Sequence, residues 1–214
     1  MQSYDAYLFD LDGTLVDTAP DINAALNFCL AKAQLATVDI SLTRHWVGYG
    51  SRTLIDQALV HHQIEGADID PLLTDFLTYY AHHLTDHSQI YPEVEPTLKQ
   101  LKDRGAKLAV VTNKLTSLAE PLIAQIGLNS YFDLIVCGDT TPHAKPDPAP
   151  VNFALNNLGV SASNALFVGD SDTDVKAAKA SHCAVVCLRN GYNHGTDVTT
   201  LAANGVIDDC RELL

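Results

Sequence analysis

A short apolar run ends at two closely spaced acids in the stretch Tyr7-Leu8-Phe9-Asp10-Leu11-Asp12-Gly13-Thr14-Leu15-Val16-Asp17-Thr18. The run is too short for a helix, so we expect a buried parallel strand that brings Asp10 to its carboxyl end. Gly13 leaves the backbone free to fold back over whatever Asp10 and Asp12 hold. Two acids this close repel each other unless a cation, a proton or hydrogen-bond donors stabilise them. An isolated Asp-x-Asp pair is usually only a strand end with solvated acids, so the interpretation depends on the rest of the chain.

The bulk composition indicates an acidic globular protein. Its 214 residues suit one domain, or one domain with a smaller insertion, and an apolar share of 47% is enough for a core. Lys and Arg number 13 against 26 Asp and Glu, and the net charge of -13 disfavours binding to nucleic acid or an anionic membrane. Any phosphate site must therefore be locally positive. We expect neither a signal peptide nor a membrane span, because the start lacks a basic region and the apolar runs are too short.

The five cysteines predict buried thiols rather than disulfides. Their number is odd, they form no CxxC pair, and most lie in apolar runs, at Cys29, Cys137, Cys183, Cys187 and Cys210. Reduced thiols are typical of a cytoplasmic protein, so we expect that location. We also expect a monomer or a homodimer.

The region after the first strand predicts a block of helices. Apolar residues recur at helical spacing over 20–35, 51–62 and 71–83, and no strand pattern lies between them. A block of about seventy residues is too long for a simple crossover helix. We therefore predict an inserted helical subdomain at 18–87, between the core segments 1–17 and 88–214.

Strands and helices alternate along the rest of the chain. The pattern predicts strands at 107–112, 133–137, 165–169, 184–188 and 206–208, with helices at 96–104, 117–126, 147–158 and 172–180. Repeated βα units indicate an α/β fold, a doubly wound parallel sheet with helices on both faces. Such sheets bind ligands at the carboxyl ends of their strands. Three apolar strands end in polar residues, at Asp10, at Thr112-Asn113 and at 169–174, and packing alone does not explain this coincidence.

One of these strand ends and one loop lysine suit a phosphate group. Thr112 and Asn113, with the backbone N–H groups beyond them, can bind phosphate oxygens, although Thr and Asn equally often cap a helix. Lys145 lies between His143-Ala144 and Pro146-Asp147-Pro148, and the prolines fix the backbone around it. A single loop lysine is ordinarily solvated, but one held beside two acids would neutralise them and an incoming phosphate.

The stretch that follows the predicted strand at 165–169 contains several acids. Gly169-Asp170-Ser171-Asp172-Thr173-Asp174 places three carboxylates directly after a buried strand. Hard oxygen ligands with no Cys or His nearby favour Mg²⁺ over zinc. A cluster that caps the next helix would explain one or two of the acids but not all three.

These four stretches, taken in order, resemble the four signatures of the haloacid dehalogenase-like hydrolases. The resemblance covers the whole core and implies a Rossmann-like fold with an inserted helical cap that closes over the site. It implies that Asp10 is a nucleophile that becomes a phospho-aspartate and that Asp12 is the general acid and base. It further implies that Mg²⁺ binds Asp10, Asp12 and Asp170, that Thr112, Asn113 and Lys145 bind the phosphoryl group, and that Asp174 supports the site from behind. Asp172 would instead cap the helix at 172–180.

Details within the resemblance favour one branch of the family. Asp12 is present, whereas the dehalogenases that need no metal lack this acid, and Ile22 stands where the phosphohexose mutases place a His. The segments 17–21, 44–50 and 190–195 resemble bacterial phosphoglycolate phosphatases. The implied substrate is a small phosphorylated metabolite, 2-phosphoglycolate, with N-acetylmuramate 6-phosphate, other sugar phosphates, nucleotides and pyrophosphate as alternatives. A non-catalytic phosphate-binding module is the rival of another class, and it is disfavoured because Asp10, Asp12, Lys145 and Asp170 are all present.

The helical block contains one stretch that helix packing does not explain, Arg44-His45-Trp46-Val47-Gly48-Tyr49-Gly50. Arg44, Gly48, Tyr49 and Gly50 are therefore candidates for substrate recognition. Arg44 would meet a substrate carboxylate or pair with an acid of the cap. Tyr49 would contact the ligand or pack between helices. The histidines of the block come in adjacent pairs that diverge on a helix, and we expect them on a solvated surface.

Overall fold

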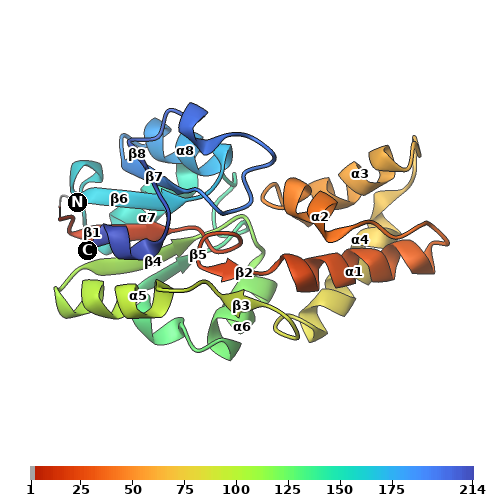
Figure 1. The fold of residues 1–214 in the computed structure, drawn as a ribbon, viewed down its shortest axis with the longest axis horizontal. Helices are drawn as coiled ribbons and strands as arrows, with labels where there is room; N and C mark the ends of the chain where they lie inside the picture. Colours follow the sequence, from red (N-terminus) through yellow and green to blue (C-terminus); the bar gives the residue numbers. More distant parts are fainter. Residues whose placement is uncertain (1–2) are drawn as a thin grey trace.

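The computed structural model describes residues 3–214 and contains a six-stranded sheet with helices on both faces (Figure 1). The strands pair in the order β5-β4-β1-β6-β7-β8, and all five pairings are parallel. Their bounds are β1 (Ala6–Phe9), β4 (Lys107–Val111), β5 (Leu134–Val136), β6 (Ala165–Gly169), β7 (Ala184–Leu188) and β8 (Gly205–Ile207). The central position of β1 brings Asp10 next to the ends of β4 and β6, as the strand-end pattern predicts.

The two faces of the sheet bury different sets of side chains, because successive residues of a strand point to opposite faces. In β1, Tyr7 and Phe9 belong to one apolar cluster, whereas Ala6 and Leu8 belong to the other. The first cluster includes apolar residues of α5 (Val94–Asp103) and α6 (Thr116–Gln125). The second includes those of α7 (Ala149–Leu158) and α8 (Asp172–Ala180). The doubly wound α/β prediction is confirmed. Short 3-10 helices complete the connections: η1 (Asn129–Tyr131), η2 (Ala162–Asn164), η3 (Val198–Thr200) and η4 (Cys210–Leu213).

Four helices form a separate layer at the opposite end of the molecule from the termini (Figure 1). They are α1 (Ala19–Lys32), α2 (Ile40–Trp46), α3 (Ser51–His61) and α4 (Ile69–His82). The sequence pattern predicts three of them and misses α2. This helix has only seven residues and buries only Thr43 and Trp46, which is too few for a periodic signal. We propose that the four helices are the cap predicted at 18–87.

Two short strands join this helical layer to the sheet, and the sequence pattern does not predict them. β2 (Val16–Asp17) and β3 (Gln89–Ile90) pair antiparallel. The buried carboxylate of Asp21, in the first turn of α1, accepts hydrogen bonds from Ser88 N at 2.7 Å, Ser88 Oγ at 2.6 Å and His87 N at 3.0 Å. The two chain connections between the layers are therefore held side by side.

Other predictions concern single residue types. All five cysteines are free and buried. The cap histidines are exposed at His61, His82 and His87 and half-buried at His62 and His83, in agreement with the expected surface location. Within residues 3–214, no helix has the length and apolar character needed to cross a membrane.

We expect Asp21→Ala to destabilise the protein by about 1–3 kcal/mol, because it removes the acceptor for three donors near the junction of the two layers. Urea unfolding followed by circular dichroism measures the change in the free energy of unfolding. Glu65→Ala is the matched control, since this acid is exposed and accepts no hydrogen bond within the described chain. Equal stability of the two variants would show that Asp21 does not hold the junction.

Candidate active site

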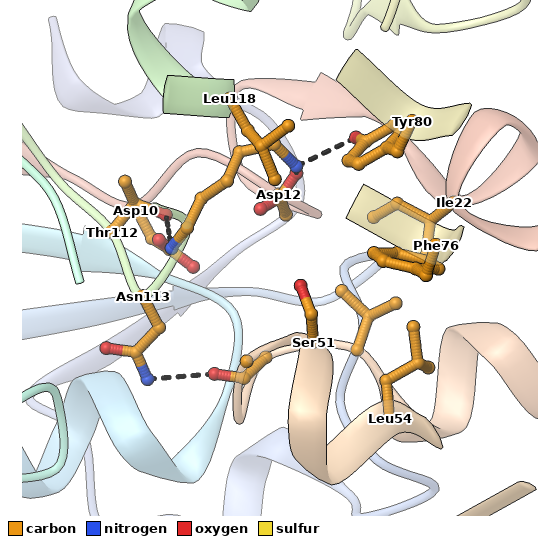
Figure 2. Close-up of a pocket in the computed structure, with 14 residues that line it drawn as sticks. Asp10, Asp12, Ile22, Ser51, Leu54, Phe76, Tyr80, Thr112, Asn113 and Leu118 are labelled. Carbon is orange, nitrogen blue, oxygen red and sulfur yellow. Dashed lines mark hydrogen bonds and ion pairs between the residues drawn. The ribbon is translucent and has the colours of Figure 1, made fainter. Parts of the chain in front are cut away.

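The ends of β1 and β4 meet at one cavity between the sheet and the helical layer. Its core side is formed by Asp10, Asp12, Thr112 and Asn113, and its cap side is largely apolar, with Ile22, Leu54 and Phe76 (Figure 2). The cavity volume is about 50 Å³. A bound water needs roughly 10–15 Å³ of such space, so the cavity holds only a few waters or a small ligand.

Asp10 is buried, and one lysine is its ion-pair partner. Lys145 Nζ lies 2.8 Å from Asp10 Oδ1 as an ion pair. Apart from this lysine, Asp10 Oδ1 has no partner among the residues that the structure describes. Burial raises the pKa of Asp10 to about 7; Lys145 opposes this rise, whereas Asp174 and Asp12 add to it. A buried carboxylate oxygen in this state is a suitable ligand for a cation.

Lys145 lies between two carboxylates, with its Nζ also 2.7 Å from Asp174 Oδ1. Asn113 fixes the backbone of this lysine from both sides, because Asn113 Oδ1 accepts from Lys145 N and Asn113 Nδ2 donates to Lys145 O, both at 2.8 Å. Asn113 Nδ2 also donates to Gly48 O of the cap at 2.9 Å (Figure 2). The structure thus places Lys145 beside the predicted nucleophile, while the Asn113 side chain holds Lys145 and the cap.

The acids after β6 divide into two roles by their hydrogen bonds. Asp174 Oδ2 accepts from Asp170 N, Ser171 N and Ser171 Oγ, and its other oxygen meets Lys145, so both oxygens are occupied. Asp170 accepts one bond on each oxygen, from Thr14 Oγ1 at 3.0 Å and Tyr192 N at 2.5 Å. Burial raises the pKa of Asp170 well above its ordinary value, and Asp174 and Asp10 raise it further.

These acids form a group that fits a hard divalent cation. One carboxylate oxygen from each of Asp10, Asp170 and Asp174 lies within 4.8 Å of the others. Lys145 pairs with only two of these three buried carboxylates, so additional positive charge would stabilise the group. Both oxygens of Asp174 are occupied by hydrogen bonds, which leaves Asp10 and Asp170 as the acids with free coordination capacity. The donor set contains only oxygens, as Mg²⁺ prefers.

The prediction that Asp172 caps α8 is wrong. Ser171 occupies the N-cap position and forms a capping box with Asp174. Asp172 is instead the first residue of the helix, where its carboxylate accepts from Lys176 Nζ and from Tyr49 Oη of the cap. The sequence pattern does not separate these choices, because Ser and Asp are both favoured caps.

Asp12 lies on the core side of the cavity and is not part of the acid group. Its Oδ1 accepts from Thr18 Oγ1 at 2.6 Å and from Lys114 Nζ at 2.8 Å. The carboxylate thus faces the cavity in a position suited to proton transfer, and it is not one of the three clustered acids. Thr112 is buried, and it lines the cavity while its Oγ1 accepts from Lys114 N at 3.1 Å. Both interpretations of Thr112, turn capping and ligand contact, agree with this position.

The candidate residues of the cap separate into two groups. Gly48 and Gly50 line the cavity. Arg44 lies outside its lining, with Nη2 2.7 Å from Asp17 Oδ2 and its guanidinium 5.4 Å from the ring centroid of Tyr192. Tyr49 donates to Asp172 Oδ1 at 2.7 Å, and its ring lies 4.7 Å from that of His194. Arg44 and Tyr49 therefore connect the cap to the core.

Two residues of the site have no role in the sequence interpretation, Lys114 and Tyr80. Lys114 follows the predicted Thr112-Asn113 pair directly, and this adjacency is the one signal that marks it. Tyr80 lies on the buried face of α4 with the apolar residues of that helix, and its spacing indicates only core packing.

A family model described as haloacid dehalogenase-like hydrolase matches residues 7–188. The chain belongs to this family, and three of the four signatures directly follow the central strands β1, β4 and β6.

Several similar proteins are described as phosphoglycolate phosphatases. A phosphoglycolate phosphatase of Colwellia psychrerythraea is 38% identical over 219 aligned positions, covering 100% of this chain and 97% of the relative. Phosphoglycolate phosphatase 1 of Pseudomonas aeruginosa is 42% identical, covering 97% of this chain and 77% of the relative. The crystal structure of a predicted phosphoglycolate phosphatase from Haemophilus somnus is 33% identical, with a TM-score of 0.93 and coverage of 100% and 97%.

We expect Gly13→Ala to destabilise the protein more than Gly66→Ala. Both glycines have positive φ, so each substitution costs about 1–2 kcal/mol of backbone strain. A Cβ at Gly13 would also lie 2.4 Å from Asp170 Oδ2 and 2.8 Å from Tyr192 Cγ, whereas one at Gly66 meets no atom within 4 Å. Urea unfolding of the two variants measures the difference, which we expect to be about 1–3 kcal/mol. Equal losses would mean that the loop at Gly13 has room for a methyl group.

Proposed function

We propose that the protein is a Mg²⁺-dependent phosphomonoesterase that acts through a phospho-aspartate and hydrolyses 2-phosphoglycolate to glycolate and phosphate. The observation that carries this proposal is the buried group of Asp10, Asp170 and Asp174, in which Lys145 pairs with Asp10 and Asp174. A buried strand-end carboxylate beside a fixed lysine is suited to attack a phosphoryl group.

The first half-reaction follows from the positions of two acids. Asp10 attacks phosphorus, the ester P–O bond breaks, and Asp12 donates its proton to the leaving alkoxide. Lys145 and Thr112 interact with the phosphoryl oxygens, and the backbone of Lys145 is held in place by Asn113. Asp10 and Asp170 would hold Mg²⁺, which when bound offsets negative charge between the nucleophile and the phosphoryl group.

The second half-reaction reverses the role of Asp12. The same carboxylate removes a proton from water, the water oxygen attacks phosphorus, and the bond from phosphorus to Asp10 breaks to release phosphate. The apolar side chains Ile22, Leu54 and Phe76 close the cap side of the cavity, so bulk water is excluded during transfer.

The proposed substrate is supported by the similarity to named relatives and by the size of the cavity. The named relatives are phosphoglycolate phosphatases, and the cavity suits a small ester better than a sugar phosphate or a nucleotide. N-acetylmuramate 6-phosphate, other sugar phosphates, nucleotides and pyrophosphate are the alternatives that a substrate panel tests. We further propose a cytoplasmic location, which the five buried free thiols support, and a monomeric or homodimeric state.

We expect Asp10→Asn to lower phosphatase activity by about a thousandfold or more, because the amide is not a nucleophile. Release of phosphate from an aryl phosphate with Mg²⁺ measures the activity. Asp5→Asn is the control, since this acid is exposed and precedes the same strand. Excess chelator should abolish wild-type activity in parallel. Activity in Asp10→Asn, or activity that ignores the chelator, would contradict the mechanism, and steady turnover by the wild type would exclude a non-catalytic binding module.

We expect 2-phosphoglycolate to have the highest kcat/KM in a panel with N-acetylmuramate 6-phosphate, hexose phosphates, nucleotides and pyrophosphate at one Mg²⁺ concentration. A sugar phosphate that exceeds it by tenfold, about 1.4 kcal/mol of transition-state preference, would overturn the substrate assignment. Such a result would leave the phosphatase mechanism intact.

A further inference from the structure

Lys114 is a buried lysine at the boundary between the core and the cap. It follows β4, its side chain is only 5% exposed, and it lines the cavity. Nζ donates to Asp12 Oδ1 and to Tyr80 Oη, each at 2.8 Å, and lies 4.7 Å from the centroid of the Tyr80 ring. Burial on its own lowers the pKa of Lys114, but Asp12 and Tyr80 more than offset this effect, so the ammonium group stays charged.

The ammonium group has a donor to spare. A lysine has three N–H donors, and within residues 3–214 two of them have partners, Asp12 and Tyr80. Asp12 and Tyr80 also line the cavity (Figure 2), and Lys114 lines it beside them. A buried ammonium with an unused donor favours an anionic ligand, since that ligand completes its hydrogen bonds.

The other cations of the site are committed elsewhere. Lys145 lies on the side of the nucleophile, between Asp10 and Asp174. Arg44, the candidate for a substrate carboxylate, pairs with Asp17 and is not part of the cavity lining. Within the described chain, Lys114 is the one Lys or Arg that lines the cavity.

The substrate carries a second anion close to the ester oxygen. In 2-phosphoglycolate, one methylene group separates that oxygen from the carboxylate. Lys114 Nζ lies 2.8 Å from Asp12 Oδ1, and both residues line the cavity. A carboxylate one methylene group away from the oxygen that Asp12 protonates would therefore lie close to this ammonium group.

We propose that Lys114 binds the carboxylate of the substrate and that Tyr80 of α4 orients it, so that this pair determines specificity for an anionic leaving group. This inference rests on the proposed function. Tyr80, a residue of the cap, would thus contribute to recognition by holding Lys114 of the core, without contacting the phosphoryl group itself.

The test is the ratio of kcat/KM for 2-phosphoglycolate to kcat/KM for ethyl phosphate, a small ester without the carboxylate. Loss of Lys114 also removes a partner of Asp12, and this effect on catalysis is common to both esters and cancels in the ratio. We expect Lys114→Met to lower the ratio by about tenfold to a hundredfold, the range of one charged hydrogen bond. Lys102→Met is the matched control, because this lysine lies on α5 and pairs with Asp133 at the surface.

Each outcome is decisive. A fall in the ratio of tenfold or more, with an unchanged ratio in Lys102→Met, supports the proposal, and any smaller fall overturns it even if both esters react slowly. Lys114→Gln, which keeps a donor but removes the charge, is judged by the same threshold if Lys114→Met does not fold. The inhibition constant of inorganic phosphate should change less than that of glycolate. A wild type that does not prefer 2-phosphoglycolate to ethyl phosphate would instead overturn the proposed substrate, and this inference with it.

Discussion

The buried ion pair network of Lys145 with Asp10 and Asp174 is the constraint on which the rest of the structure depends. Charges removed from water cost several kcal/mol each unless their partners are well placed. The strand order supplies that placement, since β1 lies between β4 and β6 and brings their carboxyl ends together. Asn113 and Ser171 then fix the lysine backbone and the Asp174 carboxylate through hydrogen bonds. The network still carries an excess of negative charge, which makes the site receptive to a cation.

The contacts between cap and core determine what else can enter. Gly48, Arg44 and Tyr49 each bond to a core residue, at Asn113, Asp17 and Asp172. These contacts bring the apolar face of the cap over the strand ends and leave a cavity of about 50 Å³. In the proposed mechanism, the core of the site recognises the phosphoryl group, while the contacts between cap and core limit the size of the leaving group.

Much of this architecture follows from local sequence. Long helices and central strands carry strong periodic patterns, and polar residues at strand ends indicate where a ligand binds. The short elements α2, β2 and β3 have too few residues for such a pattern. A local pattern also does not predict that Ser171 rather than Asp172 is the N-cap residue of α8. The two residues are adjacent and both are favoured at this position, so backbone geometry selects between them.

The sequence by itself determined the α/β class, the strand ends that bear Asp10, Thr112 and Asp170, and the restricted backbone of Lys145 before Pro146 and Pro148. These features depend on neighbours within a few residues, so composition and spacing are sufficient to find them. Only the tertiary structure decided the contacts of Arg44, Asn113 and Lys114, and with them which cation faces the cavity. Their partners Asp17, Gly48 and Tyr80 are distant in sequence, and the direction of a long or polar side chain is set by the packing of cap against core.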